Sequence, residues 1–343
     1  MYPKRIIARA DKNSYPPQFN YLIHQHNFQD FSLHDKRPKR IKSSHKIITD
    51  TLKYTIYVLK RRKDFSNAEV IITTGWIPII LKILIKFQFI SCKRFYWLGF
   101  QLHNPKLYRY FSLLLWSTSI PEETYIVNAF YEKQLYIKDL KIAPSKIQIL
   151  PYSDWGKDVC QHILPSKNYY FAGGYTNRDY ASLIETFVQN GKELVIIGSK
   201  HNNDLNVEVP DNIKILKDIK KQDFINYLVE AKACILPLRK TNAGASGQMV
   251  LLSYMRNAKV IIASDFPSVR EYVSHNSSAL LYNNNGRSLT TTLAMIEAKE
   301  TATKLKDLSD SAFQVYQENF SYQAMAKKLD TILALKLYRV SVS

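Results

Sequence analysis

A loop between two apolar runs holds the residues of this sequence that best suit chemistry on phosphate. The apolar runs are Cys234–Pro237 and Val260–Ala263, and the loop ends in Ser246-Gly247-Gln248, where apolar residues begin to recur at helical spacing. A helix that begins there would offer free backbone N–H groups and the positive end of its dipole, both of which bind phosphate. The simpler interpretation is an ordinary strand–helix–strand unit with Ser246 as the helix N-cap, because this loop is no P-loop.

Basic residues are concentrated in the N-terminal half of the chain. The 343 residues include 48 Lys and Arg against 29 Asp and Glu, a net charge of +19. Residues 1–150 contribute 25 − 10 = +15, and residues 151–343 contribute 23 − 19 = +4. An AT-rich genome would explain a uniform lysine bias but not this asymmetry. The candidate partners are nucleic acid, an anionic membrane face and a phosphorylated substrate. Nucleic acid is disfavoured, because the aromatic residues are not interleaved with the basic runs.

The cysteine and histidine positions indicate neither a disulfide framework nor a metal site. The three cysteines, Cys92, Cys160 and Cys234, are far apart, which favours a reducing cytosol. The pair His24 and His26 has no third ligand in view. The N-terminal residues contain no apolar core of signal-peptide length. The most apolar stretch, 76–90, contains two lysines and is too short to span a bilayer.

Predicted strands and helices alternate along the whole chain. In the first half we expect strands at 5–10, 28–33, 68–73, 94–98, 123–128 and 147–151, and helices at 18–26, 44–63, 76–89 and 130–136. In the second half we expect strands at 169–172, 193–197, 213–216, 233–236, 260–263 and 278–282, and helices at 178–190, at 221–230, from 246 and after 286. The polar stretch Ser153–Lys167 is interpreted as a linker. This alternation predicts an α/β protein with two parallel, doubly wound Rossmann-like sheets.

From about residue 123 to residue 285, the ordered series of elements resembles the glycosyltransferases of the GT-B fold, and most closely the retaining family 4 type. Ala258–Ser264 is similar to a Lys-Pro-Val-Ile-Ala-Ser-like strand of that family, and Ser268–Val273 to the short helix that follows it. Upstream, the family's first glycine turn and helix resemble FAGGYTNRDYASLIETF, and the end of its N-terminal domain resembles NAFYEKQLYIKDLKIAPSKIQILPYSD. The resemblance implies two Rossmann-like domains that face a central cleft.

The resemblance also implies that the two domains bind different substrates. Residues 1–155 would form the acceptor side, residues 156–320 the nucleotide-sugar donor side, and residues 321–343 a C-terminal helix that packs back towards the N-terminal domain. No metal or other cofactor is expected. A histidine that the family often carries near the donor sugar would be supplied here by His103, although a lone histidine is more often structural or at the surface.

The donor and its phosphates would be bound by a set of residues at the two glycine turns of the C-terminal domain. These residues are Gly173, Gly174, Arg178, Arg239, Lys240, Ser246, Gly247 and Gln248. The glycine pair would let the backbone approach the ligand closely, and Arg178 lies where the family has a phosphate-binding lysine. Positive charges and N–H donors stabilise a departing diphosphate. The alternative for the three cationic residues is an ordinary solvated surface.

The sequence departs from the family pattern at the donor site. The family's Glu-x7-Glu carboxylates are replaced by Ala245 and Ser253, and the arginine of its first glycine turn has no clean match beside Tyr175. We therefore expect a diverged branch that binds its donor differently, with Ser253 as a candidate ribose contact. Glu271 is retained, and a capping or scaffold role is expected for it rather than direct catalysis.

These features lead to one expected function with three alternatives. We expect a retaining hexosyltransferase-like enzyme that moves a sugar from a nucleotide-diphosphate donor to a lipid-linked or lipopolysaccharide saccharide in bacterial cell-envelope polysaccharide synthesis. An inverting enzyme of the same fold would need a base, for which Asp11, Asp30 and His103 are the candidates. A non-catalytic subunit that has lost the carboxylates is the second alternative. Nucleic-acid binding is the third and the least favoured.

The charge asymmetry adds an expectation about location. The basic N-terminal half is expected to contact anionic lipid headgroups, which places the protein in the cytoplasm at the inner face of the cell membrane. Trp76, Trp97, Trp116 and the run Tyr108–Phe111 are candidates for anchors at the lipid–water interface, although core positions are expected for most of them.

Overall fold

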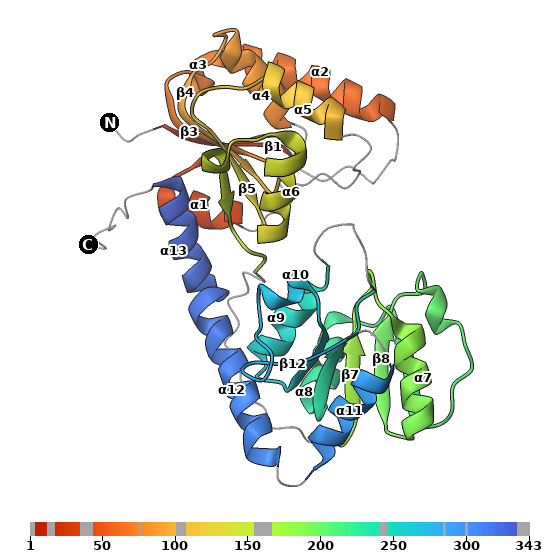
Figure 1. Cartoon of the computed structure of the whole chain (residues 1–343). Coiled ribbons are helices and arrows are strands. Elements are labelled where there is room, and N and C mark those ends of the chain that lie inside the picture. The colour runs from red at the N-terminus through yellow and green to blue at the C-terminus, as the bar shows by residue number, and fades with distance from the viewer. Residues whose placement is uncertain are drawn as a thin grey trace. The chain divides into compact units, whose positions relative to one another are not determined.

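The computed structural model of the chain consists of two compact units, each built around its own sheet (Figure 1). It describes residues 4–11, 18–34, 44–75, 77–100, 108–153, 167–239, 246–283, 286–298 and 301–334. The first unit comprises Met1–Pro151 and Ala326–Ser343, and the second comprises Tyr152–Met325. Both sheets have six strands, all parallel. The predicted α/β architecture with two doubly wound sheets is confirmed.

The first unit follows the predicted alternation with small shifts at the element ends. Its strands are β1 (Arg5–Asp11), β2 (Gln29–His34), β3 (Ala68–Thr73), β4 (Cys92–Leu98), β5 (Glu123–Val127) and β6 (Ile147–Ile149). Its helices are α1 (Gln18–His26), α2 (Ser44–Lys60), α3 (Arg62–Phe65), α4 (Ile77–Lys86), α5 (Tyr108–Ser117) and α6 (Phe130–Leu140). The helix α5 was not predicted, and the predicted helix 44–63 is divided into α2 and α3.

The strand order of the first sheet is β2-β1-β3-β4-β5-β6, so the winding reverses between β1 and β3. Buried aliphatic and aromatic residues from the strands and from α2 and α4 form one core, which includes Ile6, Tyr54 and Phe95. A second core, nearer β5, contains Trp97 and Tyr125. Trp97 is therefore a core residue, as expected for most of the aromatic residues.

An ion-pair network is buried beneath α4. Lys82 is fully buried, and its Nζ lies 2.7 Å from Glu123 Oε2 and donates to the Tyr125 hydroxyl at 2.9 Å. Lys146 Nζ and Ser119 Oγ both donate to Glu123 Oε1, at 3.0 and 2.8 Å. Burial lowers the pKa of Lys82, although Glu123 opposes this shift. Burial alone would raise the pKa of Glu123, but the attraction of Lys82 and the hydrogen bonds outweigh it, so this pKa lies below its usual range.

The last helix, α13 (Tyr322–Leu333), ends within the first unit. Its Asp330 accepts a hydrogen bond from the Tyr21 hydroxyl at 2.8 Å and lies 2.9 Å from His26 Nε2 on α1. Arg94 Nη1 donates to the carbonyl of Leu333 at 2.5 Å, which satisfies an acceptor at the helix C-terminus. The helix α13 is thus joined to α1 and β4.

The second unit also follows the predicted order. Its strands are β7 (Tyr170–Gly173), β8 (Leu194–Gly198), β9 (Ile213–Lys217), β10 (Ala233–Leu236), β11 (Ile261–Ser264) and β12 (Leu280–Tyr282). Its helices are α7 (Tyr180–Asn190), α8 (Lys221–Glu230), α9 (Gln248–Arg256), α10 (Pro267–Arg270), α11 (Gly286–Glu297) and α12 (Ala302–Asn319), and α13 begins here. Most of the predicted linker, residues 154–166, lies outside the described residues, as does the basic run 36–42.

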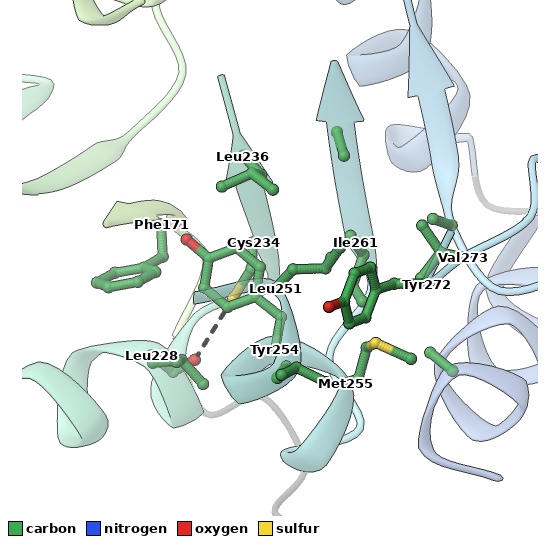
Figure 2. Packing of buried hydrophobic residues seen from close by; sticks show 14 of the residues in the cluster. Phe171, Leu228, Cys234, Leu236, Leu251, Tyr254, Met255, Ile261, Tyr272 and Val273 are labelled. Atoms are coloured by element: carbon green, nitrogen blue, oxygen red, sulfur yellow. Dashed lines mark hydrogen bonds between the residues drawn. The ribbon is translucent and has the colours of Figure 1, made fainter. Parts of the chain in front are cut away.

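The core of the second unit packs α9 against the sheet through buried aromatic and sulfur-containing side chains (Figure 2). Tyr254 of α9 is fully buried and forms an edge-to-face pair with Phe171 of β7, with ring centroids 6.0 Å apart. The Cys234 thiol donates weakly to the Leu228 carbonyl at 3.9 Å. Burial raises the pKa of Cys234 to about 12, so this thiol is a packing group and not a nucleophile.

None of the helices within the described residues has both the length and the apolar character needed to cross a membrane.

Candidate functional site

The candidate site lies at the carboxyl ends of β7 and β10, where the second sheet reverses its winding. The strand order is β12-β11-β10-β7-β8-β9, and β7 and β10 are parallel neighbours, although 59 residues separate the end of β7 from the start of β10 (233 − 174 = 59). In an open α/β sheet, ligands bind outside the strand ends at such a switch point. The two loops there are those interpreted from the sequence as glycine turns that precede helices.

Four hydrogen bonds tie these two loops together. Asn177, in the loop after β7, donates from Nδ2 to Ser246 Oγ at 2.9 Å and to the Arg239 carbonyl at 3.1 Å. The Arg239 amide donates to the Asn177 carbonyl at 3.3 Å, and the Asp179 amide donates to the Pro237 carbonyl at 3.0 Å. The two loops therefore form one connected unit. Asn177 was not predicted as a site residue, since a single asparagine beside a glycine turn has no spacing pattern of its own.

The first turn requires glycine at positions 173 and 174 because neighbouring side chains leave no room for a Cβ atom, whether or not a ligand is bound. A Cβ atom on Gly173 would lie 2.6 Å from the Phe224 ring. Gly174 has φ +120°, and a Cβ atom there would lie 2.3 Å from Arg178 Nη2. Both positions exclude a larger side chain.

Arg178 lies beneath this turn and is only 5% exposed. Its Nε donates to the Gly173 carbonyl at 3.1 Å, and its Nη1 donates to the Thr176 carbonyl at 2.6 Å. Burial lowers the pKa of Arg178, while the hydroxyls of Tyr180 and Tyr254 act in the opposite direction. The guanidinium therefore holds the shape of the turn and places a positive charge under it.

The second loop ends at Gly247, directly before the first residue of α9. The N-cap of α9 is Gly247, with φ +92°, and not Ser246. Leu236 and Leu238 side chains lie 3.1–3.3 Å from the position of a Cβ atom on Gly247, so glycine is required here as well. Ser246 Oγ instead accepts the hydrogen bond from Asn177.

Gln248, the first residue of α9, has an unsatisfied buried amide. It is 4% exposed, and among the residues that the structure describes its Nε2 has no hydrogen-bond partner. An unsatisfied buried donor is costly. This donor lies at the helix end where an anion would be stabilised.

Two buried hydroxyls brace the strand ends around the site. The Tyr254 hydroxyl accepts from the Gly173 amide at 3.1 Å and donates to the Ile235 carbonyl at 3.2 Å, which joins β7 to β10. Ser264 Oγ, at the end of β11, accepts from the Leu238 amide at 2.8 Å. Neither residue was predicted, because a tyrosine or serine at an apolar helix or strand end looks like part of the core.

Three other candidate residues either make contacts within the protein or end a helix. Arg239 forms an ion pair with Asp204 at the surface. Ser253 Oγ donates to the Met249 carbonyl within α9 at 3.0 Å. Glu271 is the C-cap of α10. Lys240, Ala245 and His103 lie outside the described residues.

Two of the residues considered for an inverting mechanism or a metal site, Asp30 and His26, have partners within the first unit. In the first unit, Asp30 is paired with the buried Arg9, whose Nε donates to Asp30 Oδ1 at 3.0 Å. Asp11 is the last residue of β1. His24 is exposed on α1, whereas His26 is buried against Asp330. Within the described part of the chain, no three His, Cys, Asp or Glu side chains gather as a metal site would require.

A pocket of about 410 Å³ lies beside α8, and its lining includes Lys167, Tyr227 and Glu230. None of the residues expected to bind the donor lines it. The loop geometry at the switch point, and not this pocket, marks the candidate site, because backbone donors and a helix N-terminus converge there.

Most of the second unit matches a known protein family. Residues 168–298 match the family of glycosyl transferases group 1, and this range contains both loops. A search of curated proteins found no match to the sequence.

Solved structures share the fold over nearly the whole chain at low sequence identity. A glycosyltransferase from Rickettsia africae has a TM-score of 0.68 at 13% identity and covers 97% of this chain and 98% of its own. HepE from Anabaena in complex with UDP has a TM-score of 0.66 at 12% identity, with 96% and 99% covered. WaaG, a glycosyltransferase involved in lipopolysaccharide biosynthesis, has a TM-score of 0.61 at 11% identity, with 96% and 100% covered.

The domain match and the fold agree with what the residues led us to expect. The two six-stranded parallel sheets are those of the GT-B fold, and the second carries its glycine turns in the matched range. The predicted enzyme class is thereby confirmed: the chain is a glycosyltransferase with the GT-B fold, and its residues 168–298 match the family of glycosyl transferases group 1.

Proposed function

We propose that the enzyme transfers a sugar from a nucleotide-diphosphate donor, with retention at the anomeric carbon, to a saccharide acceptor carried by a lipid or by lipopolysaccharide. The observation that carries the donor half of this proposal is the pair of loops joined by Asn177 and Ser246 at the switch point of the second sheet. The HepE complexes with UDP and with UDP-glucose support a nucleotide sugar as the ligand.

In the proposed complex, the diphosphate binds at the N-terminus of α9. The backbone N–H groups after Gly247 and the amide of Gln248 would donate to its oxygens, and the buried Arg178 would add positive charge from beneath the first turn. These groups stabilise negative charge as the glycosidic bond breaks and the diphosphate leaves. Because the protein holds them in place before the reaction, little reorganisation accompanies the charge development.

The proposal also accounts for Ala245 and Ser253, which stand where the family has its two carboxylates. Ser253 is a candidate for the ribose contact, and its hydroxyl can turn from the Met249 carbonyl to a ligand. A front-side mechanism, in which the leaving phosphate assists the incoming hydroxyl, needs no protein nucleophile. His103 stays a candidate for the donor-sugar contact, and no metal is proposed.

The proposal for the acceptor and for its location rests on charge. The first 150 residues carry +15, which suits an acceptor held at an anionic lipid surface on the inner face of the cell membrane. The similarity in fold to WaaG supports a cell-envelope acceptor. We therefore place the enzyme in bacterial cell-envelope polysaccharide synthesis.

The decisive experiment measures ligand binding first and turnover second. Thermal unfolding is followed with UDP, GDP and CMP and with their sugar conjugates, in the presence and absence of EDTA. The expected result is a rise in the unfolding temperature with one nucleotide class, unchanged by EDTA, since a ligand that binds only the folded state stabilises it. If no nucleotide raises this temperature, the chain is instead a non-catalytic subunit.

Turnover is then measured with the stabilising donor and membrane-extracted acceptors. Proton NMR of the first-formed product gives the anomeric configuration. Retention is expected, and inversion would instead favour a base mechanism. Failure to consume any donor despite tight nucleotide binding would contradict the proposed acceptor class.

A further inference from the structure

The helix α2 is apolar on two faces. Its inner face buries Tyr54 and Val58 in the core of the first unit. Its outer face exposes Leu52, Ile56 and Leu59, at 59%, 52% and 37%. Their i, i+4, i+7 spacing places them in one row along the helix. A helix that covers a sheet normally carries polar residues on that row, so the core does not explain this second apolar stripe.

The two neighbouring helices repeat the pattern. On α5, the side chains of Tyr110, Leu113 and Trp116 recur at i, i+3 and i+6 and are 71%, 61% and 80% exposed. At the end of α4, Phe87 and the following Phe89 are 67% and 53% exposed. Trp116 is therefore one of the aromatic residues that do not take a core position.

The three helices lie side by side on one side of the first sheet (Figure 1). The helices α2 and α4 share one hydrophobic core. The helices α4 and α5 are joined where Lys86 Nζ donates to the Ser117 carbonyl at 2.6 Å. The outward stripes of neighbouring helices thus belong to one surface, which we call the α2–α4–α5 face.

This face is basic as well as apolar. Residues 44–65, which span α2 and α3, contain six Lys and Arg and two Asp. The exposed cations include Lys53 and Lys60 on α2 and the run Arg61–Lys63 that follows it. An interface between two copies of a chain is usually depleted in lysine, and its core is depleted in charged residues. Apolar and aromatic side chains flanked by lysine and arginine are typical of proteins that lie on anionic lipid.

We propose that the α2–α4–α5 face is the surface by which the enzyme binds an anionic lipid bilayer. The aromatic and aliphatic side chains would enter the boundary between headgroups and acyl chains, and the cations would contact lipid phosphates. The proposal deepens the proposed function, in which the acceptor is held at a lipid surface, by naming the part of the chain that contacts the lipid.

The test is sedimentation of the full chain with vesicles, without donor or acceptor. Vesicles of phosphatidylcholine alone are compared with vesicles that also contain phosphatidylglycerol, at low and high salt. Two variants probe the face: L113S/W116S removes apolar anchors, and K60Q/R62Q/K63Q removes charge. The matched control is V188S/V207S, because Val188 and Val207 are 49% and 51% exposed in the second unit.

The wild-type chain and the control are expected to bind only the anionic vesicles, more weakly at high salt. The L113S/W116S variant should bind at least about tenfold more weakly, since apolar burial in the interface is lost. Each charge removed in the second variant should weaken binding by roughly fivefold. All four proteins should unfold at the same temperature, because the changed side chains are exposed.

Two outcomes would overturn the proposal. One is equal vesicle binding by the wild type and both face variants. The other is concentration-dependent dimerisation in light scattering that L113S/W116S abolishes, without vesicle binding, which would make the face an interface between copies. Neither result changes the outcome of the nucleotide-binding test. A failure of the proposal for the α2–α4–α5 face can therefore be distinguished from a failure of the proposed donor site.

Discussion

Asn177 and Ser246 are 69 positions apart in the sequence, yet the Asn177 Nδ2 donates to the Ser246 Oγ at 2.9 Å. This hydrogen bond joins the loop after β7 to the loop before α9. The candidate donor site is therefore one framework in which two loops hold each other, and a change at either loop is expected to affect the other.

Replacing Asn177 by alanine tests this framework. The variant loses the hydrogen bonds to Ser246 and to the Arg239 carbonyl, so the N-terminus of α9 is positioned less well. We expect nucleotide affinity to fall by about tenfold and the free energy of unfolding by about 1 kcal/mol. Calorimetric titration and urea unfolding measure the two quantities.

The control for that change is Asn190→Ala. Asn190 lies at the other end of α7, where its Nδ2 donates to Thr186 and Thr290 at 2.6 and 3.2 Å. Its loss should lower stability to a similar extent and leave nucleotide affinity unchanged. Equal affinity losses in both variants would mean that general destabilisation, and not the link between the loops, sets the affinity.

Gln248→Leu tests whether the Gln248 amide binds the ligand or stabilises the folded protein. Leucine has nearly the same volume and removes a buried amide that has no partner among the described residues, so the free energy of unfolding should stay equal or rise by about 1 kcal/mol. Nucleotide affinity should fall by about tenfold, because the donor to the diphosphate is lost. Gln222→Leu on the exposed face of α8 is the control and should alter neither quantity. A large loss of stability in Gln248→Leu would show that the amide is satisfied within the protein.

Gly174→Ala should be among the most destabilising single changes in the second unit. Gly174 has φ +120°, and its added methyl group would meet the Arg178 guanidinium at 2.3 Å. We expect a loss of about 2 kcal/mol or more in the free energy of unfolding. Gly191→Ala is the matched comparison: its φ is +62°, it has open space around the Cβ position, and it should cost about 1 kcal/mol. Comparable losses at both positions would contradict the packing of Arg178 beneath the turn.

Glu123→Gln tests the buried network of the first unit. It leaves Lys82 without its carboxylate partner in a buried site, so we expect a loss of about 3 kcal/mol at neutral pH. Glu122→Gln changes an exposed neighbour and should have little effect. Chemical denaturation of the three proteins measures this difference.

The same pair of residues predicts a pH dependence. The pKa of Glu123 is lower in the folded protein than its usual value, so its contribution to stability is present above the unfolded-state pKa of about 4.3. That contribution is lost as the pH falls through the lower folded value. The wild-type protein should therefore lose stability more steeply than Glu123→Gln below about pH 4. Parallel curves for the two proteins would show that the carboxylate is not stabilised by Lys82.

The strands were predictable because buried parallel strands appear as short apolar runs bounded by turn residues. β3 and β10 agree with their expected bounds, as does the helix α8. The helix α5 could not be recognised, because Leu115 points into the core while Tyr110, Leu113 and Trp116 point outward. With apolar residues on both faces, no helical period stands out from the sequence.

The site was predictable only in outline. The glycine turns and the start of α9 could be located, since glycine and the apolar periodicity mark them. The inward direction of Arg178 could not, because it depends on carbonyl groups that the folded turn brings together. Tyr254 and Asn177 were missed for the same reason: their roles arise from β7 and β10 becoming neighbours, which is a property of the sheet and not of local sequence.

The path of the chain has a consequence for biosynthesis. The Tyr21 hydroxyl bonds to Asp330 across 309 residues, whereas the second unit is one uninterrupted segment. During synthesis, all of the second unit is therefore made before the last turns of α13, on which the first unit depends. The first unit is begun first, yet α1 and β4 gain these contacts with α13 only after Asp330 and Leu333 have been made.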